Sequence, residues 1–168
     1  MIVQIRVDDR LVHGQIAMVW SKSLSLRHIV VASDKAAENE IMKSTMAMAV
    51  PNGIKLLVRN VDDSIVFFNS EKTRDVRLFV LTSNVRDALK IAQNCREVVG
   101  AVNVANVGKF DGVPTSEKTA LIDGFFSEPE LEALKQLAQI DGLDVYHQIT
   151  PERSQESVKK ALINNNLI

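Results

Sequence analysis

Residues 76–95 read VRLFVLTSNVRDALKIAQNC, an apolar run followed by a segment with helical periodicity. Residues 28–33, HIVVAS, are a second apolar run of the same kind. A strand with one solvated face would alternate apolar and polar residues, so these runs predict strands that are buried on both faces of a parallel sheet. The helices between such strands act as right-handed crossovers.

The alternation of strand and helix continues over the whole chain. Strands are expected at 1–7, 28–33, 54–60, 76–83, 97–104 and 143–150, with 118–123 as a candidate for one more. Helices are expected at 14–24, 37–50, 61–70, 84–95, 127–142 and 154–165. The predicted class is therefore α/β. We expect a single domain, residues 1–168, with an open, doubly wound, mainly parallel sheet of six or seven strands and helices on both faces.

The composition excludes several classes of protein. The 20 Lys and Arg residues against 21 Asp and Glu residues give a net charge of -1, without the basic excess of a sequence-independent nucleic-acid binder. The single cysteine, Cys95, precludes an internal disulfide and favours a reducing compartment. The sequence shows neither a signal peptide nor an apolar run of about 18 residues that could span a bilayer. We therefore expect a cytoplasmic protein whose membrane connections run through a partner.

The first loop of this sheet carries an unusual density of ionisable groups. In open parallel sheets, ligands bind beyond the carboxyl ends of the strands, near the point where the strand order reverses. Residues 8–14, DDRLVHG, follow the first strand directly and therefore lie at that edge. His13 stands immediately before the expected start of the first helix, where free backbone N–H groups favour a phosphate.

The residue types around His13 suit a phosphoryl acceptor. Arg10 offers a guanidinium fork to the same anion, and Gly14 lets the backbone approach closely. Asp8 or Asp9 could accept a ring N–H and leave the other ring nitrogen as the nucleophile. The N–H groups of Gly14, Gln15 and Ile16 would complete the phosphate cradle. The same pattern also fits a solvated turn with a capping histidine and a surface ion pair.

The other candidate residues give weaker signals. Thr82 and Ser83 end the fourth strand, where their hydroxyls could donate to the phosphate or cap the helix that starts near Asn84. His28 opens the second strand, at the edge opposite the expected site, and His147 lies inside the last strand. No His, Cys or Asp cluster has metal-ligand spacing, and neither GxxxxGK[ST] nor GxGxxG occurs. We therefore expect no metal and no cofactor.

Residues 6–20, RVDDRLVHGQIAMVW, resemble the opening of the IIB subunits of the mannose/fructose/sorbose family of the bacterial sugar phosphotransferase system. The resemblance continues through 29–56, 76–89 and 98–110 and covers essentially the whole chain. One stretch, Asn103–Gly108, departs from the family pattern of Asn, Ile or Val, Gly, Gly after the fifth strand.

The resemblance implies a protein-Nπ-phosphohistidine–sugar phosphotransferase. Its phosphoryl group would be carried on Nδ1 of His13, received from a phosphohistidine of a IIA protein, and passed to a sugar delivered by the membrane subunits IIC and IID. Arg10 matches the phosphate-binding arginine of the family motif. Asp8 and Asp9 match its aspartates, to which we assign a structural or orienting role. The identity of the sugar is not encoded in the motif.

Two other classes of protein fit parts of the pattern. A receiver-like signalling domain would use an early acidic pair to bind a metal, with Asp62 as phosphoacceptor and Lys109 as the accompanying lysine; His13 would then have no role. A non-catalytic paralogue would only bind a partner, although the intact His13 and Arg10 argue against loss of the site.

Overall fold

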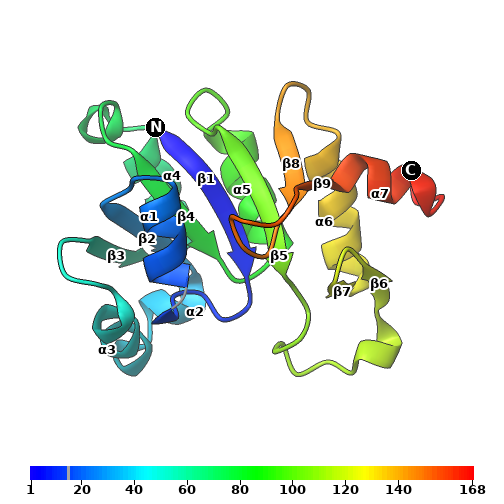
Figure 1. Ribbon diagram of the computed structural model, residues 1–168, viewed down its shortest axis with the longest axis horizontal. Coiled ribbons are helices and arrows are strands. Elements are labelled where there is room, and N and C mark those ends of the chain that lie inside the picture. Colours follow the sequence, from blue (N-terminus) through cyan, green and yellow to red (C-terminus); the bar gives the residue numbers. More distant parts are fainter. Residues whose placement is uncertain (15) are drawn as a thin grey trace.

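Seven strands form the central sheet in the order β3-β2-β4-β1-β5-β8-β9, and Figure 1 shows this arrangement in a computed structural model that describes residues 1–14 and 16–168. The strands are β1 (Ile2–Asp8), β2 (His28–Ala32), β3 (Lys55–Arg59), β4 (Leu78–Thr82), β5 (Ala101–Asn106), β8 (Asp144–His147) and β9 (Glu156–Ser157). The short strands β6 (Thr119–Leu121) and β7 (Gly124–Phe126) form a separate antiparallel hairpin.

Helices connect these strands. The α-helices are α1 (Ser21–Ser23), α2 (Asp34–Ala37), α3 (Glu40–Ala49), α4 (Val61–Phe68), α5 (Val85–Asn94), α6 (Glu128–Ala138) and α7 (Val158–Asn164). A π-helical turn, η1 (Ile16–Trp20), precedes α1, and the 3₁₀ turns are η2 (Glu71–Thr73) and η3 (Thr115–Glu117). Within the described part of the chain, none of these helices is long and apolar enough to cross a membrane.

The parallel sheet and its burial are confirmed. All pairings from β3 across to β8 are parallel, and only the short β9 joins the sheet antiparallel, against β8. Every residue of β4 is buried, as expected for a central strand that is covered on both faces. Apolar residues on each face pack against a different layer of helices, which explains why these strands lack alternation.

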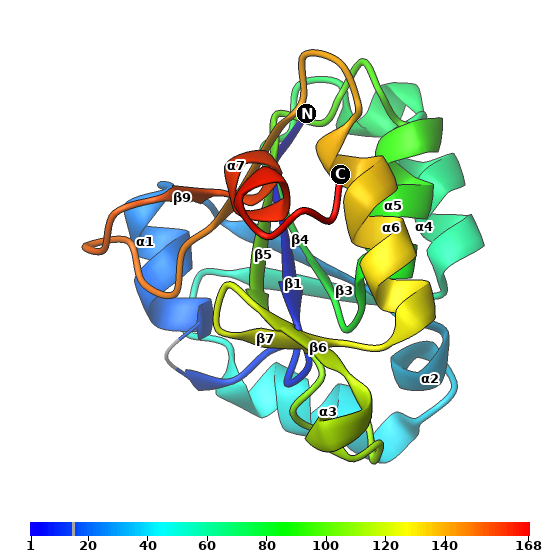
Figure 2. The ribbon, with the colours of Figure 1, turned by 90° about the vertical axis from the view of Figure 1, so that its right-hand side faces the viewer.

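The two helical layers cover opposite faces of the sheet, as Figure 2 shows. On one face, η1 and α3 pack through Ile16, Trp20 and Met46 against Phe79 and Leu81 of β4. On the other face, α4, α5 and α6 contribute to a larger apolar cluster that includes the buried thiol of Cys95. The chain leaves β1 toward β2 over the first face and leaves β4 toward β5 over the second. The strand order therefore reverses between β1 and β4, as the doubly wound class requires.

Several element boundaries differ from the prediction. The helix expected at 37–50 begins later, at Glu40, where the side chain of Asn39 caps α3 through the N–H of Met42; the separate short helix α2 ends at Ala37. The helix expected at 154–165 begins only at Val158, since Glu156 and Ser157 pair with β8. The strand candidate at 118–123 is real, but it pairs with β7 outside the main sheet.

Candidate functional site

The loop after β1 turns sharply before His13. Leu11 adopts a positive φ of 54°, in the left-handed region that a leucine side chain disfavours, and its N–H donates to the carbonyl of Asp8 at 2.9 Å. The Leu11 side chain is buried in the core, which holds the turn in place. Helical bonding starts next, because the N–H of Ala17 donates to the carbonyl of His13 at 3.1 Å. His13 is thereby fixed at the beginning of the helical segment.

A small pocket of about 70 Å³ contains the imidazole of His13. Arg6 and Arg10 line the same pocket, so two guanidinium groups share this space with one imidazole. The rest of its lining consists of Ile16, Val19, Trp20, Asn106, Ile149 and Thr150. The predicted association of His13 with Arg10 and Ile16 is therefore present in the structure. Two cations beside a neutral imidazole form an environment suited to a small anion.

Asp8 is completely buried and organises the groups around the pocket. One carboxylate oxygen, Oδ1, accepts the backbone N–H of Arg10 at 3.1 Å and lies 3.5 Å from Nε of Arg10. The other, Oδ2, accepts Nη2 of Arg6 at 3.3 Å and the carboxamide of Asn106 at 2.9 Å. Asp8 thus binds both arginines, while the Arg10 side chain remains 45% exposed and open to a ligand.

Asp9 points to a different part of the molecule. Its Oδ2 accepts the backbone N–H groups of Lys109 at 2.7 Å and Phe110 at 3.1 Å. Burial raises the pKa of Asp9, and these N–H groups oppose that shift. The carboxylate therefore anchors the loop that follows β5.

The expectation that Asp8 or Asp9 accepts a ring N–H of His13 was wrong. Nδ1 of His13 lies 3.3 Å from the backbone carbonyl oxygen of Leu11 instead. Both carboxylates are occupied by the contacts just described. The tight turn at Leu11 directs a peptide carbonyl toward the ring, and residue types alone gave no indication of this.

His13 is held in the neutral state by its surroundings. Burial lowers the pKa of His13 below its ordinary value of 6.5, and the positive charge of Arg10 lowers it further, while the charge of Asp8 opposes the shift. A neutral imidazole retains the lone pair that a nucleophile needs. Proximity to Arg10 therefore favours an anion in the pocket and also favours the neutral imidazole of His13 at neutral pH.

On the expectation that His13 accepts a phosphoryl group, as the family resemblance implies, uptake should stay constant through neutral pH and decline only below pH 6.5, because the lowered pKa of His13 preserves its neutral form. In an Arg10→Gln variant the midpoint of this decline should move to higher pH, since the charge of Arg10 no longer lowers the pKa of His13. The uptake rate should also fall by about 100-fold with the loss of a guanidinium donor. Single-turnover rates between pH 5 and 8 and a direct NMR titration of His13 measure both effects. An unchanged titration midpoint in Arg10→Gln would contradict the influence of Arg10 on the pKa of His13.

Of the described residues expected to form the phosphate cradle, Ile16 lines the His13 pocket and Gly14 is not among its lining residues. Ile16 is buried in the wall of the pocket, and a side chain at Gly14 would meet open space, so Gly14 is not required there by crowding. Gln15 lies outside the described residues. Ser83 lines a separate hollow of about 430 Å³, together with Asp9, Asn84 and Phe110.

This placement of Ser83 does not support its predicted contact with a phosphate on His13. Ser83 lies between β4 and α5, whereas His13 lies between β1 and η1. The helices η1 and α5 cover opposite faces of the sheet, and the two residues line separate hollows. The hydroxyl of Thr82 donates to the carbonyl of Asn84, and the side chain of Asn84 caps α5 through the N–H of Asp87. The side chain that caps α5 is therefore that of Asn84, and not that of Thr82 or Ser83.

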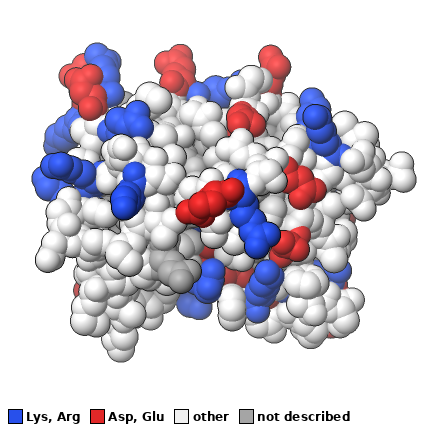
Figure 3. Space-filling model, viewed as in Figure 1, with Lys and Arg blue, Asp and Glu red and all other residues white. Residues whose placement is uncertain are grey.

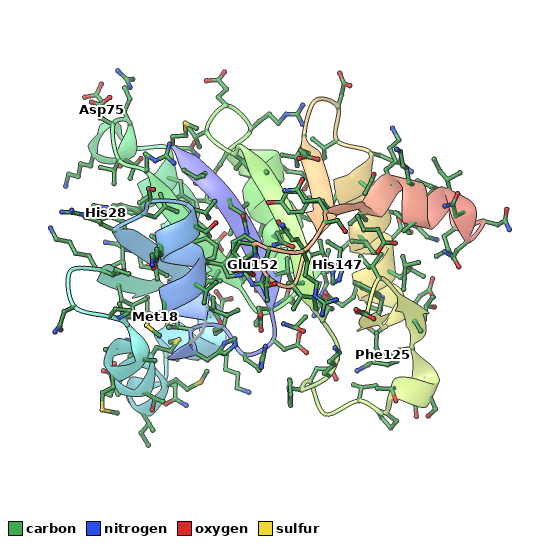
Figure 4. The ribbon with its side chains drawn as sticks, in the orientation of Figure 1. Met18, His28, Asp75, Phe125, His147 and Glu152 are labelled. Carbon is green, nitrogen blue, oxygen red and sulfur yellow. The ribbon has the colours of Figure 1, made fainter. Side chains whose placement is uncertain are left out.

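The stretch Asn103–Gly108, which comprises the end of β5 and the first residues after it, contributes to both hollows. Asn106 lines the His13 pocket and donates to Asp8, while Gly108 lines the larger hollow. Gly108 has a φ of 74°, and a Cβ there would lie 1.7 Å from the carbonyl oxygen of Phe125. A glycine is therefore required where β5 leaves the sheet and passes the β6–β7 hairpin, whose Phe125 is labelled in Figure 4.

Arg6 and Asn106 are site residues that the sequence analysis did not single out. Arg6 is 1% exposed although it carries a guanidinium, and Asn106 is also buried. The available signal was a charged residue at position 6, inside the otherwise apolar first strand. Its significance depends on partners from the far end of the chain, the carbonyls of Gln148 and Ile149.

The remaining histidines and the cysteine have structural surroundings. His28 begins β2 at the edge opposite His13, and Figure 4 shows it well apart from His147. His147 is buried at the end of β8, with Nδ1 2.8 Å from the carbonyl oxygen of Val104. Cys95 is buried, and burial raises the pKa of its thiol, as expected for a core residue rather than a nucleophile. Among the described residues, no group of His, Cys, Asp and Glu could hold a metal ion.

The topology argues against the receiver-like alternative. In the flavodoxin-like order of receiver domains, β3 lies beside β1. Here β3 is the edge strand, separated from β1 by β2 and β4. Asp62, in the first turn after β3, forms an ion pair with Lys90 at 2.7 Å rather than approaching Asp8 or Asp9. The three acidic residues that such a site needs are therefore not brought together.

The surface charge agrees with the composition. On the face shown in Figure 3, acidic and basic side chains both occur across the surface, without one continuous field of a single sign. This distribution differs from the basic stripe that tracks a nucleic-acid backbone.

The chain resembles known proteins along nearly its whole length. Residues 2–167 match the family described as the sorbose subfamily IIB component of the sugar phosphotransferase system, or PTS. A probable phosphotransferase enzyme IIB component of Streptococcus pyogenes serotype M6 is 48% identical over 155 residues, which are 92% of this chain and 94% of that protein. A mannose-specific EIIAB component of Escherichia coli K12 is 29% identical over 79% of this chain but only 39% of its own length.

A solved structure shows the same fold. The IIB domain of the sorbose permease of Klebsiella pneumoniae superimposes with a TM-score of 0.84 at 20% identity, covering 98% of this chain and 97% of that one. The fold, the loop after β1 and the family match together define a PTS IIB component, a class that implies sugar phosphotransfer. Within that class, the chain belongs to the sorbose subfamily.

Proposed function

We propose that this protein accepts a phosphoryl group on His13 from the phosphohistidine of a IIA protein and transfers it to a sugar that enters through the membrane subunits IIC and IID. The observation that carries the proposal is the placement of His13 in a small pocket with two arginines. The Escherichia coli relative, which is named as an EIIAB component, supports a IIA partner. The proposed location is the cytoplasm, at the inner face of the membrane through IIC and IID.

The proposed chemistry consists of two in-line transfers. In the first, the P–N bond of the donor breaks as a P–N bond to His13 forms; in the second, that bond breaks as a P–O bond to a sugar hydroxyl forms and the hydroxyl proton is released. Arg10 would bind the oxygens of the transferring group, whose negative charge spreads in the transition state. Backbone N–H groups of Gly14, Gln15 and Ile16 are proposed to assist at the helix start. The proposal involves no metal and no cofactor.

Nδ1 is proposed as the acceptor nitrogen, and its contact with Leu11 defines what transfer to it requires. A nitrogen 3.3 Å from a carbonyl oxygen is best matched by an N–H, whereas an acceptor needs a lone pair. The imidazole therefore turns away from Leu11 and places its proton on Nε2 before attack. Asp8 takes part indirectly, because it fixes the backbone and the guanidinium of Arg10. Asp9 acts on the neighbouring loop through Lys109 and Phe110.

The test is transfer from phosphoenolpyruvate through the general PTS enzymes and a mannose-family IIA protein to the wild-type chain. We expect one acid-labile phosphate, located on the peptide that contains His13 by mass spectrometry. The ¹⁵N shifts of the phosphorylated imidazole should identify Nδ1 as the substituted nitrogen. A phosphate on another peptide contradicts His13 as acceptor, and substitution at Nε2 contradicts the proposed turn of the ring.

A further inference from the structure

Arg6 is a buried cation in the wall of the His13 pocket. Its side chain is 1% exposed, and burial lowers its pKa to about 10, against the opposing charge of Asp8, so it remains charged at neutral pH. Burying a charge is costly unless it is paired and hydrogen-bonded. An apolar residue at this position of β1 would avoid that cost. The presence of an arginine therefore calls for an explanation in terms of what it contacts.

The guanidinium of Arg6 joins parts of the pocket that are far apart in sequence. Nη1 donates to the carbonyl of Gln148 at 3.0 Å, and Nη2 donates to the carbonyl of Ile149 at 3.2 Å. Nη2 also contacts Oδ2 of Asp8 at 3.3 Å, while the planar group lies 4.9 Å from the centre of the Trp20 ring. The planar guanidinium of Arg6 thus connects Asp8 at the end of β1, Trp20 at the end of η1 and the segment after β8.

The segment after β8 forms the wall of the pocket to which Ile149 and Thr150 belong. Figures 2 and 4 show this segment, with Glu152 at its exposed part, in front of the sheet and beside α1. Gln148 stabilises it from within, because its carboxamide donates to the carbonyls of Pro151 at 3.3 Å and Arg153 at 2.6 Å. Arg6 is the charged group that attaches this preformed segment to the strand leading to His13.

Nε of Arg6 has no hydrogen-bond partner within the described ranges, 1–14 and 16–168. Each of the other two nitrogens is bonded. A buried donor without a partner is uncommon and costs stability.

We propose that Arg6 is a positioning residue for phosphoryl transfer: its fork holds Asp8, and through it Arg10, in a fixed relation to the Gln148–Thr150 wall that faces His13. This inference rests on the proposed function of His13. The planar geometry is essential, because a lysine ammonium is a compact point charge and does not reproduce a fork. A displacement of about 1 Å in a transfer site costs about 100-fold in rate.

The test compares Arg6→Lys and Arg6→Gln with wild type in single-turnover transfer from a phosphorylated IIA protein. We expect transfer in both variants to be about 100-fold slower, without an equivalent rise in KM for the donor, since a buried side chain does not touch the partner. Arg6→Gln should also raise the pKa of His13 in an NMR titration, because a nearby cation is removed, whereas Arg6→Lys should leave it lowered. The matched control is Arg77→Gln, an arginine at the opposite edge of the sheet that donates to the carbonyl of Leu24.

The outcomes separate this inference from the proposed function. If wild type takes up no phosphate on His13, both are overturned. If wild type is active and Arg6→Lys transfers at the wild-type rate, charge alone is sufficient and only the positioning role is overturned. If Arg6→Gln fails to fold, Arg6→Lys decides: slow transfer supports the role of the fork, and a wild-type rate refutes it.

Discussion

Replacing His13 with alanine is expected to abolish the uptake of acid-labile phosphate from a phosphorylated IIA protein. The imidazole supplies the only proposed nucleophile of the transfer, and among the described residues that line the pocket no other group could take its place in forming a P–N bond. The fold should persist, because His13 is partly exposed and the one hydrogen-bond contact of its ring to described residues is long, 3.3 Å to the carbonyl oxygen of Leu11. Radiolabel transfer and intact-mass analysis measure the loss.

His28→Ala is the matched control for this experiment. His28 lies at the start of β2, at the opposite edge of the sheet, and its removal should leave uptake unchanged. Label on His13→Ala would identify another acceptor, and Asp8 and Asp9 would then be tested. Failure of wild type to accept phosphate from a verified IIA donor would favour a paralogue that only binds a partner.

Replacing Asp8 with alanine is expected to lower the free energy of unfolding by about 3–5 kcal/mol, the usual cost of removing one partner from a buried ion pair. Asp8 is fully buried, and its loss leaves the buried guanidinium of Arg6 without its carboxylate partner and the carboxamide of Asn106 without its acceptor. Transfer to His13 should slow as well, since Arg10 loses its anchor. Urea unfolding followed by circular dichroism measures the stability change.

Asp9→Ala provides the comparison within the same dipeptide. Asp9 is half-buried and accepts two backbone N–H groups of an exposed loop, so its loss should cost only about 1–2 kcal/mol. The two neighbouring aspartates are therefore expected to differ clearly in stability. Equal and small losses for both variants would contradict the central place of Asp8 in the buried network.

The chain order of strands and helices was predictable because it depends on local patterns. The apolar runs at 28–33 and 76–83 indicated buried parallel strands, and the boundaries that shifted did so for tertiary reasons. Glu156 and Ser157 became a strand only because β8 presents a free edge to them. Asn39 set the start of α3 through a side-chain cap inside a segment whose helical periodicity had indicated an earlier start.

The site was predictable only in part. The sequence indicated that His13, Arg10 and Ile16 belong together, since they are close along the chain and follow one strand. It did not distinguish Asp8 from Asp9, whose carboxylates point to different partners although the residues are adjacent. Ser83 was associated with His13 because both lie at the same edge of the sheet, yet they line separate hollows.

By itself the sequence determined the α/β class, the edge of the sheet at which His13 lies and the loop that contains the proposed acceptor. These properties follow from hydrophobic periodicity and from the rule that parallel strands end at a common edge. Tertiary structure alone decided which buried groups surround that histidine. Arg6 acquires its proposed role from the carbonyls of Gln148 and Ile149, more than 140 residues away, because β5 pairs with both β1 and β8 and so brings the segment after β8 within reach of Arg6. Such long-range partners are set by packing, which no local pattern of residues encodes.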